Sequence, residues 1–418
     1  MANSDTGTVL LYFTPLSLLV YLVLPHNYLV DIPTAYILKN RLHASASQVA
    51  DFRLLIAIPV YLSFLFGFSR DTWNPLGLRD RGYFLLFGIV TALVFFVLAL
   101  APLSYGGLLV GMLMAMASFR FLMAAYQGLM ALVGQEQLMS GRITALWQII
   151  NSVSSLGAGF AAGYVAQHFT PMQTFALIGA LALVIAALAF WKPAAVFAHV
   201  YDRPEAQGSD LIGDLKRLVR HKAIYPPLVI MLLFQFFPGF GTPLQYYLSD
   251  RLHASDAVFG QFNGIFAISF VPMYFLYGVI CRRLSLKVLL WIGSIVCIPQ
   301  LFPLMFIHSG LGALIMAVPM GMMGGIAVAA VYDLTMRSCP AGLQGTLMML
   351  SEGAYILSAR GSDVLGSAIY DASPANAFFY CAVLTAVVYA AVLPVLLLIP
   401  REILETRDGE ASPALQAA

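Results

Sequence analysis

Seven ionisable side chains lie inside long apolar stretches of this sequence. They are the residues most able to bind a charged ligand or to carry a proton there. Placing a charge at the centre of an apolar slab costs at least about 2.5 kcal/mol, so each such residue is expected to have a function or a buried partner. The seven are Asp31, Arg53, Arg120, Asp333, Glu352, Arg360 and Asp363.

Arg120 is the first candidate for substrate binding because it lies near the middle of the apolar stretch 107–133. At about 1.5 Å per helical residue, this depth prevents the side chain from reaching an aqueous surface easily. A guanidinium there would suit bidentate capture of a carboxylate or phosphate. Gln127, seven residues further on, shares its helix face. The alternative is a structural ion pair with a buried acid.

The stretch 343–369 carries one polar stripe. Eleven residues at about 100° each place Asp363 within roughly 20° of Glu352, with Arg360 about 60–80° away. Glu352 is the first candidate for proton coupling, because a carboxyl removed from water can bind a proton near neutral pH. Asp363 is a second candidate, although Arg360 and Asp363, three residues apart, are expected to neutralise one another.

Uncharged polar side chains complete the candidate substrate site. Gln148 and Asn151 lie on one face of the stretch 142–167. This stretch is the fifth apolar stretch of the first half of the chain, and 343–369 is the fifth of the second half. Tyr355 lies three residues after Glu352 and therefore on the same helix.

Two further pairs of charges are expected near the ends of spans. Asp31 lies between Pro25 and Pro33 and is a candidate for binding a proton or substrate, with pairing to Arg53 as the alternative. The prolines leave backbone carbonyls without donors, so this segment is expected to bend. Asp333 and Arg337, four residues apart, predict an ion pair at the inner end of their helix.

The composition indicates an all-α polytopic membrane protein. Of 418 residues, 60% are hydrophobic and 10% are charged, and the mean hydropathy is +0.84. Soluble domains carry roughly 25% charged residues. The alternating pattern of a membrane β-barrel does not occur. Twelve apolar stretches are long enough to cross a bilayer: 9–38, 47–69, 83–103, 107–133, 142–167, 172–192, 226–248, 257–280, 286–307, 311–336, 343–369 and 375–399.

Lys and Arg residues are distributed unequally between the loops. With the N-terminus inside, most of them lie on the cytoplasmic side, and the opposite face holds only Lys39, Arg41 and Arg251. The positive-inside rule therefore places both termini in the cytoplasm. The first stretch has neither a basic n-region nor a cleavage site, so it is expected to be retained. We expect a multi-pass protein of the cytoplasmic (inner) membrane.

The pentapeptide RLHAS occurs at 41–45 and again at 251–255, and its neighbours repeat at the same offset of 210. This duplication predicts two parallel six-helix halves. Ser45 is expected to cap the second helix, with Gln48 completing a capping box. Ser255 and Asp256 are expected to begin the corresponding helix of the second half.

The predicted domains follow this division. They are a six-helix bundle over 1–193, a cytoplasmic linker with an amphipathic helix over 194–224, a second six-helix bundle over 225–400 and a cytoplasmic tail over 401–418.

The loop after the second stretch reads GFSRDTWNPLGLRDRGYF. Its Gly67, Asp71, Gly77, Arg79 and Arg81 resemble a loop motif of the major facilitator superfamily. The resemblance implies twelve transmembrane helices in two pseudo-symmetric six-helix bundles, with a charged latch between the halves at the inner face. A degraded copy in the second half retains Gly278, Arg282, Arg283 and Lys287.

The spacing of this loop, and CPAGLQGT at 339–346, are more similar to the folate–biopterin transporter family. Related permeases for muropeptides or acyl-CoA are competing relatives. The superfamily's drug/proton antiporters carry a proline in the fifth helix, and none lies between Gly141 and Thr170. Gly159 and Gly163 of that helix are expected to allow close packing.

These patterns predict a secondary active transporter that takes up a small organic anion, pteridine-like or otherwise carboxylate-bearing, by alternating access. Its expected partners are the substrate, protons or sodium ions and the lipid bilayer, and it is expected to be a monomer. An exporter of amphipathic compounds or drugs is one alternative, and a transporter-like receptor or scaffold without turnover is another. No sequence motif predicts an enzyme, a cofactor, a metal site or a nucleic-acid partner. The four cysteines have no metal-ligand spacing, and no structural disulfide is expected.

Overall fold

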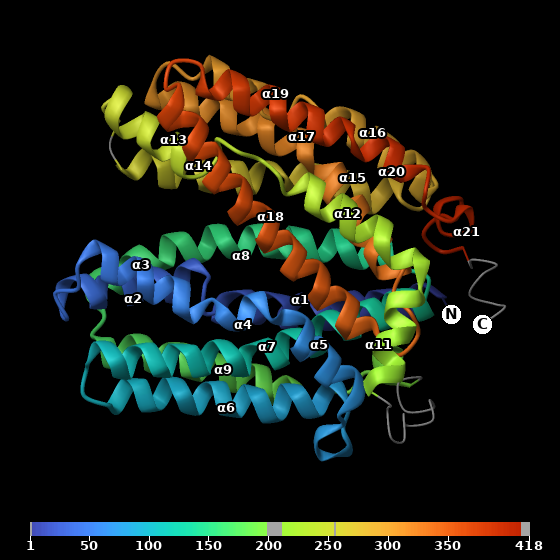
Figure 1. Cartoon of the computed structure of the whole chain (residues 1–418). Coiled ribbons are helices and arrows are strands. Elements are labelled where there is room, and N and C mark those ends of the chain that lie inside the picture. The colour runs from blue at the N-terminus through green and yellow to red at the C-terminus, as the bar shows by residue number, and fades with distance from the viewer. Residues whose placement is uncertain (1, 199–210, 255, 411–418) are drawn as a thin grey trace. The chain divides into compact units, whose positions relative to one another are not determined.

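The computed structural model describes residues 2–198, 211–254 and 256–410, and every regular element in these ranges is helical (Figure 1). The predicted cap at Ser255 lies outside the described residues, as do parts of the linker and of the tail. The first half forms α1 (Ala2–Val23), α2 (Tyr28–Asn40), α3 (Ala46–Ile56), α4 (Ile58–Tyr61), α5 (Ser63–Thr72), α6 (Asp80–Leu100), α7 (Tyr105–Glu136), α8 (Ser140–His168) and α9 (Pro171–Leu188), and the predicted linker contains α10 (Ala194–Phe197) and α11 (Leu211–Arg220).

The second half continues the helical pattern. It forms α12 (Tyr225–Phe234), α13 (Thr242–Tyr246), α14 (Asp256–Ser269), α15 (Val271–Ile280), α16 (Leu286–Cys297), α17 (Gly310–Arg337), α18 (Gln344–Ala372), α19 (Ala377–Ala390), α20 (Val392–Leu396) and α21 (Arg401–Leu404). A π-helical turn follows α13 at Tyr247–Arg251.

Ten helical stretches of the described chain are long and apolar enough to cross a membrane. The two other predicted spans differ for identifiable reasons. The stretch 343–369 forms the 29-residue α18, whose ionisable residues lower its hydropathy. The stretch 226–248 is divided between α12 and α13. The helices are therefore consistent with the twelve predicted spans.

The contacts group the chain into two compact units. Unit 1 comprises the described residues of 1–132, 153–218 and 340–350, and unit 2 the remainder. Each unit thus includes a short segment from the other half of the sequence. Helix α8 begins in unit 2 and continues in unit 1, and α18 begins in unit 1 and continues in unit 2. The domain bounds given above stay a prediction from the repeat.

The first span of each half is interrupted. Between α1 and α2, Pro25 has no backbone N–H, and the Asn27 side chain accepts the N–H of Tyr28 as the N-cap of α2. Between α12 and α13, the chain passes Pro238 and then Gly239, whose φ of 92° suits a glycine. The bend predicted for the first span is confirmed, and the same break occurs in the second half.

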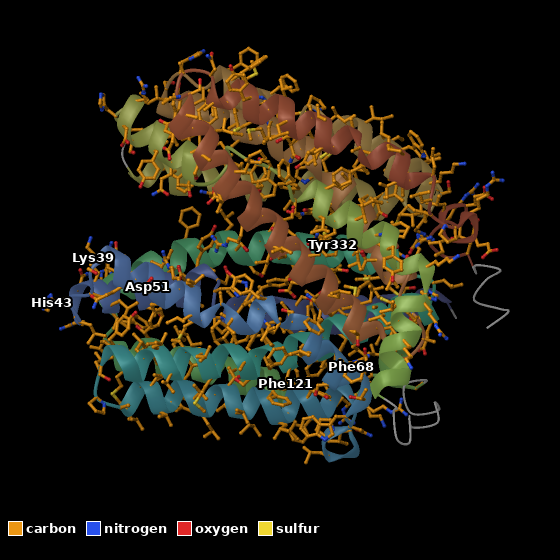
Figure 2. The ribbon with its side chains drawn as sticks, in the orientation of Figure 1. Lys39, His43, Asp51, Phe68, Phe121 and Tyr332 are labelled. Carbon is orange, nitrogen blue, oxygen red and sulfur yellow. The ribbon has the colours of Figure 1, made fainter. Side chains whose placement is uncertain are left out.

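The RLHAS repeat is a helix-ending motif followed by a helix start. His43 and His253 both have left-handed backbone, with φ of 51° and 49°. In both copies the next N–H reaches back six residues, from Ala44 to the carbonyl of Leu38 and from Ala254 to the carbonyl of Leu248, and so satisfies a carbonyl at the end of the helix. The capping box of Ser45 and Gln48 is confirmed. Figure 2 shows His43 at one end of unit 1, beside Lys39 and Asp51.

Small residues let pairs of helices pack closely in each unit. In unit 1, α6 and α9 lie side by side (Figure 1), and a Cβ atom on Gly88 would meet α9 at 3.0 Å. In unit 2, α16 packs against α17, and a Cβ atom on Gly293 would approach the α17 backbone to 2.7 Å. The expectation of close packing is wrong at Gly163, where a Cβ atom would meet no described atom within 4 Å, and at Gly159 a Cβ atom would make only an ordinary contact, 3.7 Å from the Tyr28 ring.

Gly67→Ala is expected to lower the thermal unfolding temperature of the purified protein. A Cβ atom at Gly67 of α5 would lie 2.4 Å from the carbonyl oxygen of Gly345, so the backbone must shift. Such overpacking costs typically about 1–3 kcal/mol. The matched control is Gly163→Ala, because a Cβ atom at Gly163 would meet open space. This variant should unfold at the same temperature as the wild type. Equal unfolding temperatures for both variants would contradict the close approach of α5 and α18.

Candidate functional site

Arg120 of α7 is fully buried, and its Nη2 lies 3.3 Å from Nδ1 of His26. Because arginine has hydrogen-bond donors and no acceptor, Nδ1 must accept this bond and cannot itself carry a proton. The contact therefore requires a neutral imidazole with its proton on Nε2. A protonated His26 would instead place two cations at this short separation.

The break in the first span positions His26. It lies between Pro25 and Asn27 in the gap that separates α1 from α2, and its side chain is exposed. The amide of Asn27 donates to the carbonyl of Tyr21 and so ties the gap to the end of α1. The position predicted from Arg120 alone thus also contains a titratable side chain that the sequence analysis did not single out.

The other predicted substrate-binding residues are divided between the two units. In unit 1, Gln127 is buried on α7. In unit 2, Gln148 is buried on the first turns of α8, whereas Asn151 on α8 and Tyr355 on α18 are partly buried. Each residue lies on the helix expected for it, and the binding role of this set stays a prediction.

Glu352 lies beside an aromatic group in unit 2. Tyr332, labelled in Figure 2, contacts Trp147 edge to face, with 4.7 Å between ring centres. Glu352 and Tyr355 are both close enough to Tyr332 to interact with it electrostatically. Tyrosine hydroxyls beside a carboxylate can accept or relay a proton. The proton-coupling role of Glu352 stays a prediction.

The two other carboxylates predicted for proton coupling have defined partners. Asp31 pairs with Arg53, with 2.6 Å between Oδ2 and Nη2. Pairing with Arg53, the alternative to proton or substrate binding by Asp31, is therefore the observed arrangement. Asp363 accepts the backbone N–H and the hydroxyl of Thr242, each at 2.8 Å. The expected Arg360–Asp363 pair is wrong. The carboxylate binds the first turn of α13, and Arg360 is exposed.

Arg70 joins two carboxylates within the motif of the first half. Its Nε and Nη2 donate to the two oxygens of Asp80 at 2.6 and 2.8 Å, and its Nη1 donates to Asp71 at 2.8 Å. Asp71 also accepts the N–H groups of Gly345 and Thr346 at 3.0 and 2.7 Å. These N–H groups begin α18, where the helix dipole favours a negative charge. Within unit 1, Asp71 of the motif therefore binds the start of α18, a helix from the second half of the sequence.

The two arginines of the motif shape the start of α6. Arg81 Nε donates to the carbonyl of Ala189 at 2.7 Å, and its guanidinium lies 5.9 Å from the ring centre of Phe197. Arg79 has a φ of 50°, and its N–H donates to the Asn74 side chain at 2.6 Å. The predicted latch depends most directly on Asp71 and Arg70.

The predicted ion pair of Asp333 and Arg337 is confirmed, with 2.8 Å between Oδ1 and Nε. The buried carboxylate of Asp333 also accepts the hydroxyls of Ser140 at 2.6 Å and Tyr277 at 2.7 Å. Ser140 is the first residue of α8. Within unit 2, the Asp333–Arg337 pair from the second half of the sequence therefore binds the start of a helix from the first half. This arrangement fits the gate role that was predicted for the pair.

Three residues of these networks were missed in the sequence, and each had a visible signal. Asp80 is an acid in a loop otherwise rich in Arg, and Arg70 directly precedes the motif's Asp71. His26 is a titratable residue that follows Pro25 inside an apolar span. The spacing of residues along one sequence cannot identify the partner of any of these three residues, because each contact joins different helical segments.

Asp71→Asn is expected to lower the unfolding temperature, because it weakens hydrogen bonds to both Arg70 and the first turn of α18. A hydrogen bond to a charged group contributes about 1.5–3 kcal/mol. Asp51→Asn is the matched control, since Asp51 is exposed on α3 (Figure 2). If Asp71→Asn unfolds at the wild-type temperature, this carboxylate does not stabilise the start of α18.

Solved structures with the same fold are transporters. The proton:xylose symporter XylE, bound to 6-bromo-6-deoxy-D-glucose, has a TM-score of 0.69 and 13% identity over 98% of this chain and 99% of that chain. The transporter FucP in its outward conformation has a TM-score of 0.67 and 15% identity over 93% and 98% of the chains. The human organic anion transporter MFSD10 has a TM-score of 0.63 and 14% identity over 94% and 99%. At these identities the likeness shows the fold alone.

The sequence itself identifies the family. A search of curated protein sequences found no match. The profile of the Major Facilitator Superfamily, however, matches residues 17–359, which is most of the chain. The chain therefore belongs to the major facilitator superfamily, whose members are membrane transporters and not enzymes.

Proposed function

We propose that this protein is a proton-coupled uptake transporter for a small organic anion, working by alternating access between its two six-helix halves. The observation that carries the proposal is the contact between the buried Arg120 and His26. It combines a permanent cation suited to a carboxylate or phosphate with an imidazole, the type of side chain that proteins most often use to take up and release a proton.

The interrupted first spans also support the proposal of a substrate site. The breaks at 24–27 and 235–241 fall in corresponding spans of the two halves. Broken helices at corresponding places in two repeats are typical of secondary-transporter binding sites, because the unwound backbone offers polar groups to the cargo. Gln127, Gln148, Asn151 and Tyr355 are the side chains proposed to complete the site.

Proton binding and anion binding are expected to favour each other at Arg120. A proton on His26 breaks the Nδ1 hydrogen bond, releases a guanidinium donor and adds a second positive charge. A bound anion compensates both charges, so the two ligands are thermodynamically linked. Glu352 remains the proposed coupling carboxylate of unit 2. Asp31 and Asp363 are less suited to this role, because Arg53 and Thr242 already bind them.

The proposed cargo is a carboxylate-bearing pteridine or a similar small acid. It rests on the resemblance of the loops 71–83 and 339–346 to the folate–biopterin transporters. The proposed setting is the inner membrane, with a monomeric protein, both termini in the cytoplasm and protons as the coupling ion. Counterflow of labelled substrate in sealed vesicles would distinguish a carrier from a receptor, because only a carrier exchanges substrate across the membrane.

Arg120→Gln is expected to abolish stabilisation by anions in a thermal-shift screen of pterins, folates, simple carboxylates, sugar phosphates and cationic drugs. Ligand at about 100 times its Kd should stabilise the wild type by about 2.7 kcal/mol. Arg120→Lys should retain only part of the shift, because lysine lacks the bidentate fork.

The control for this screen is Arg360→Gln, because Arg360 is an exposed arginine of another span. It should respond to anions as the wild type does. If only cationic or apolar compounds stabilise the wild type, the anion proposal is wrong, and export of amphipathic compounds becomes the better explanation.

His26→Gln is expected to remove the pH dependence of anion binding between pH 6 and 8. In the wild type, affinity should rise on acidification by up to about tenfold per pH unit, the limit for one linked proton. The variant should still exchange labelled anion but should not accumulate it against a gradient. His168→Gln, at the exposed end of α8, is the control. An unchanged pH profile in His26→Gln would show that the coupling proton binds elsewhere.

A further inference from the structure

The segment 404–409, here called the tail strap, is bound to several other segments of unit 2. Leu404 is buried in the apolar core of the unit. The carbonyl of Thr406 accepts the backbone N–H of Leu286 at 3.2 Å and Nη1 of Arg337 at 3.0 Å. The strap is therefore attached both to the loop before α16 and to the end of α17.

Asp408 is the central residue of the tail strap. Its carboxylate accepts the backbone N–H of Gly141 at 2.9 Å and Nε of Arg142 at 2.5 Å. Its own N–H donates to the carbonyl of Cys281 at 3.0 Å, and the next N–H donates to the carbonyl of Leu138 at 2.7 Å. The Asp408 side chain is completely buried. It thus binds the first turn of α8 in the way that a helix N-terminus binds an anion.

The charge of Asp408 depends on its arginine neighbours. Burial raises the pKa of this carboxyl above its usual range, and Asp333 raises it further, whereas Arg142 and Arg337 lower it. A buried carboxylate without such partners would be strongly destabilising. The pKa is raised overall, while the N–H of Gly141 and the guanidinium of Arg142 donate to the carboxylate and stabilise its ionised form.

The internal repeat shows what this acid replaces. In the first half, Asp71 follows the second span and binds the first turn of α18. Cys281 takes the corresponding place beside the first turn of α8: a Cβ atom on Gly141 would lie 3.1 Å from its side chain, as a Cβ atom on Gly345 would lie 2.9 Å from Asp71. The offset of the RLHAS repeat leads to the same position, whereas aligning Gly67 with Gly278 would place Arg282 there, and neither residue is an acid. Burial raises the pKa of the Cys281 thiol above its usual range, so the thiol supplies no negative charge. The first turn of α8, the fifth helix of the other half, is bound by Asp408 instead.

We propose that Asp408 of the tail strap replaces the acid missing at position 281 and closes a latch that must open in each transport cycle. The strap joins residues 138–142, from the first half of the sequence, to Cys281, Leu286 and Arg337 of the second half. Alternating access requires the halves to separate at each face in turn, so a link between them must be released. This last step rests on the proposed function.

The first test uses Cys281 as a built-in reporter. Its side chain is buried, and burial keeps the thiol protonated and slow to react. Purified full-length protein is treated with a maleimide, and each cysteine is quantified by mass spectrometry. Asp408→Asn should label Cys281 about tenfold faster than the wild type, the scale expected for one lost hydrogen bond to a charged group. Cys297 of α16 is the internal reference and should not change.

Glu410→Gln is the matched control, because it also removes one acidic charge near the end of the described chain. Glu410 is exposed; its carboxylate lies 3.8 Å from the Arg407 guanidinium and accepts the Arg407 backbone N–H at 3.0 Å, a bond that the amide oxygen of glutamine can also accept. This variant should label Cys281 at the wild-type rate. If Asp408→Asn also labels at the wild-type rate, the carboxylate does not hold the strap closed, and the proposal is wrong.

The second test restores the acid at the position where the repeat would place it. A variant lacking residues 405–418 should exchange the Gly141 amide hydrogen faster, as followed by mass spectrometry of a peptide covering 138–145. Adding Cys281→Asp to this variant should recover protection, whereas Cys281→Asn should not. If Cys281→Asp leaves exchange as fast as in the shortened protein, Asp408 does not replace an acid at position 281.

Both tests are made without ligand, so they can fail or succeed independently of the anion proposal. An Arg120→Gln protein that binds no anion should still show slow Cys281 labelling. If the strap opens as expected in Asp408→Asn but the wild type carries no substrate, the role of Asp408 in closing the strap stands, and both the transport proposal and the opening in each cycle are wrong.

Discussion

Three aspartates of this protein, Asp71, Asp363 and Asp408, each accept at least one backbone N–H at the start of a helix. The first N–H groups of a helix have no partner within it, and in an apolar medium no water replaces that partner. A carboxylate satisfies them and also interacts favourably with the helix dipole. These contacts fix where α18, α13 and α8 begin. The long spans and the polar residues on them, including Glu352 and Gln148, are positioned from these starting points.

The duplicated halves have kept backbone features more faithfully than charged side chains. His43 and His253 adopt the same left-handed conformation, and the first span is interrupted in both halves. The charges differ. Arg70 binds Asp71 and Asp80 beside the start of α18, whereas Asp333, Arg337 and Asp408, from other places in their half, surround the start of α8. A helix start needs a negative group but does not specify which segment supplies it, so the source could change while the geometry stayed the same.

Local spacing explains which parts of this structure could be predicted. The capping box of Ser45 and the pair of Asp333 and Arg337 involve residues three or four apart, so helical geometry brings them together. The twelve spans and the duplication could likewise be recognised from hydropathy and from the RLHAS repeat. The predicted Arg360–Asp363 ion pair does not form although the spacing allows it, because the first turn of α13 binds the Asp363 carboxylate instead.

The remaining site contacts join residues far apart in the sequence. Asp71 and Gly345 are separated by 274 residues, and Arg142 and Asp408 by 266. The contact of His26 with Arg120 spans 94 residues. No periodic pattern links such positions, and each depends on how helices pack after the chain has folded. The residue types could be identified as unusual, but their partners required the structure.

The backbone bond between Cys281 and Asp408 has a consequence for how this chain can vary. Where a side chain supplies the anion, its position can accept only an acid. Where a distant segment supplies it, the same position needs only a carbonyl oxygen in the right place and a side chain small enough to be covered. The start of α8 therefore depends less on which residue occupies position 281 than on the length and path of the segment that carries Asp408. Insertions or deletions of even one residue between α21 and Asp408 should therefore be tolerated less well than substitutions at position 281.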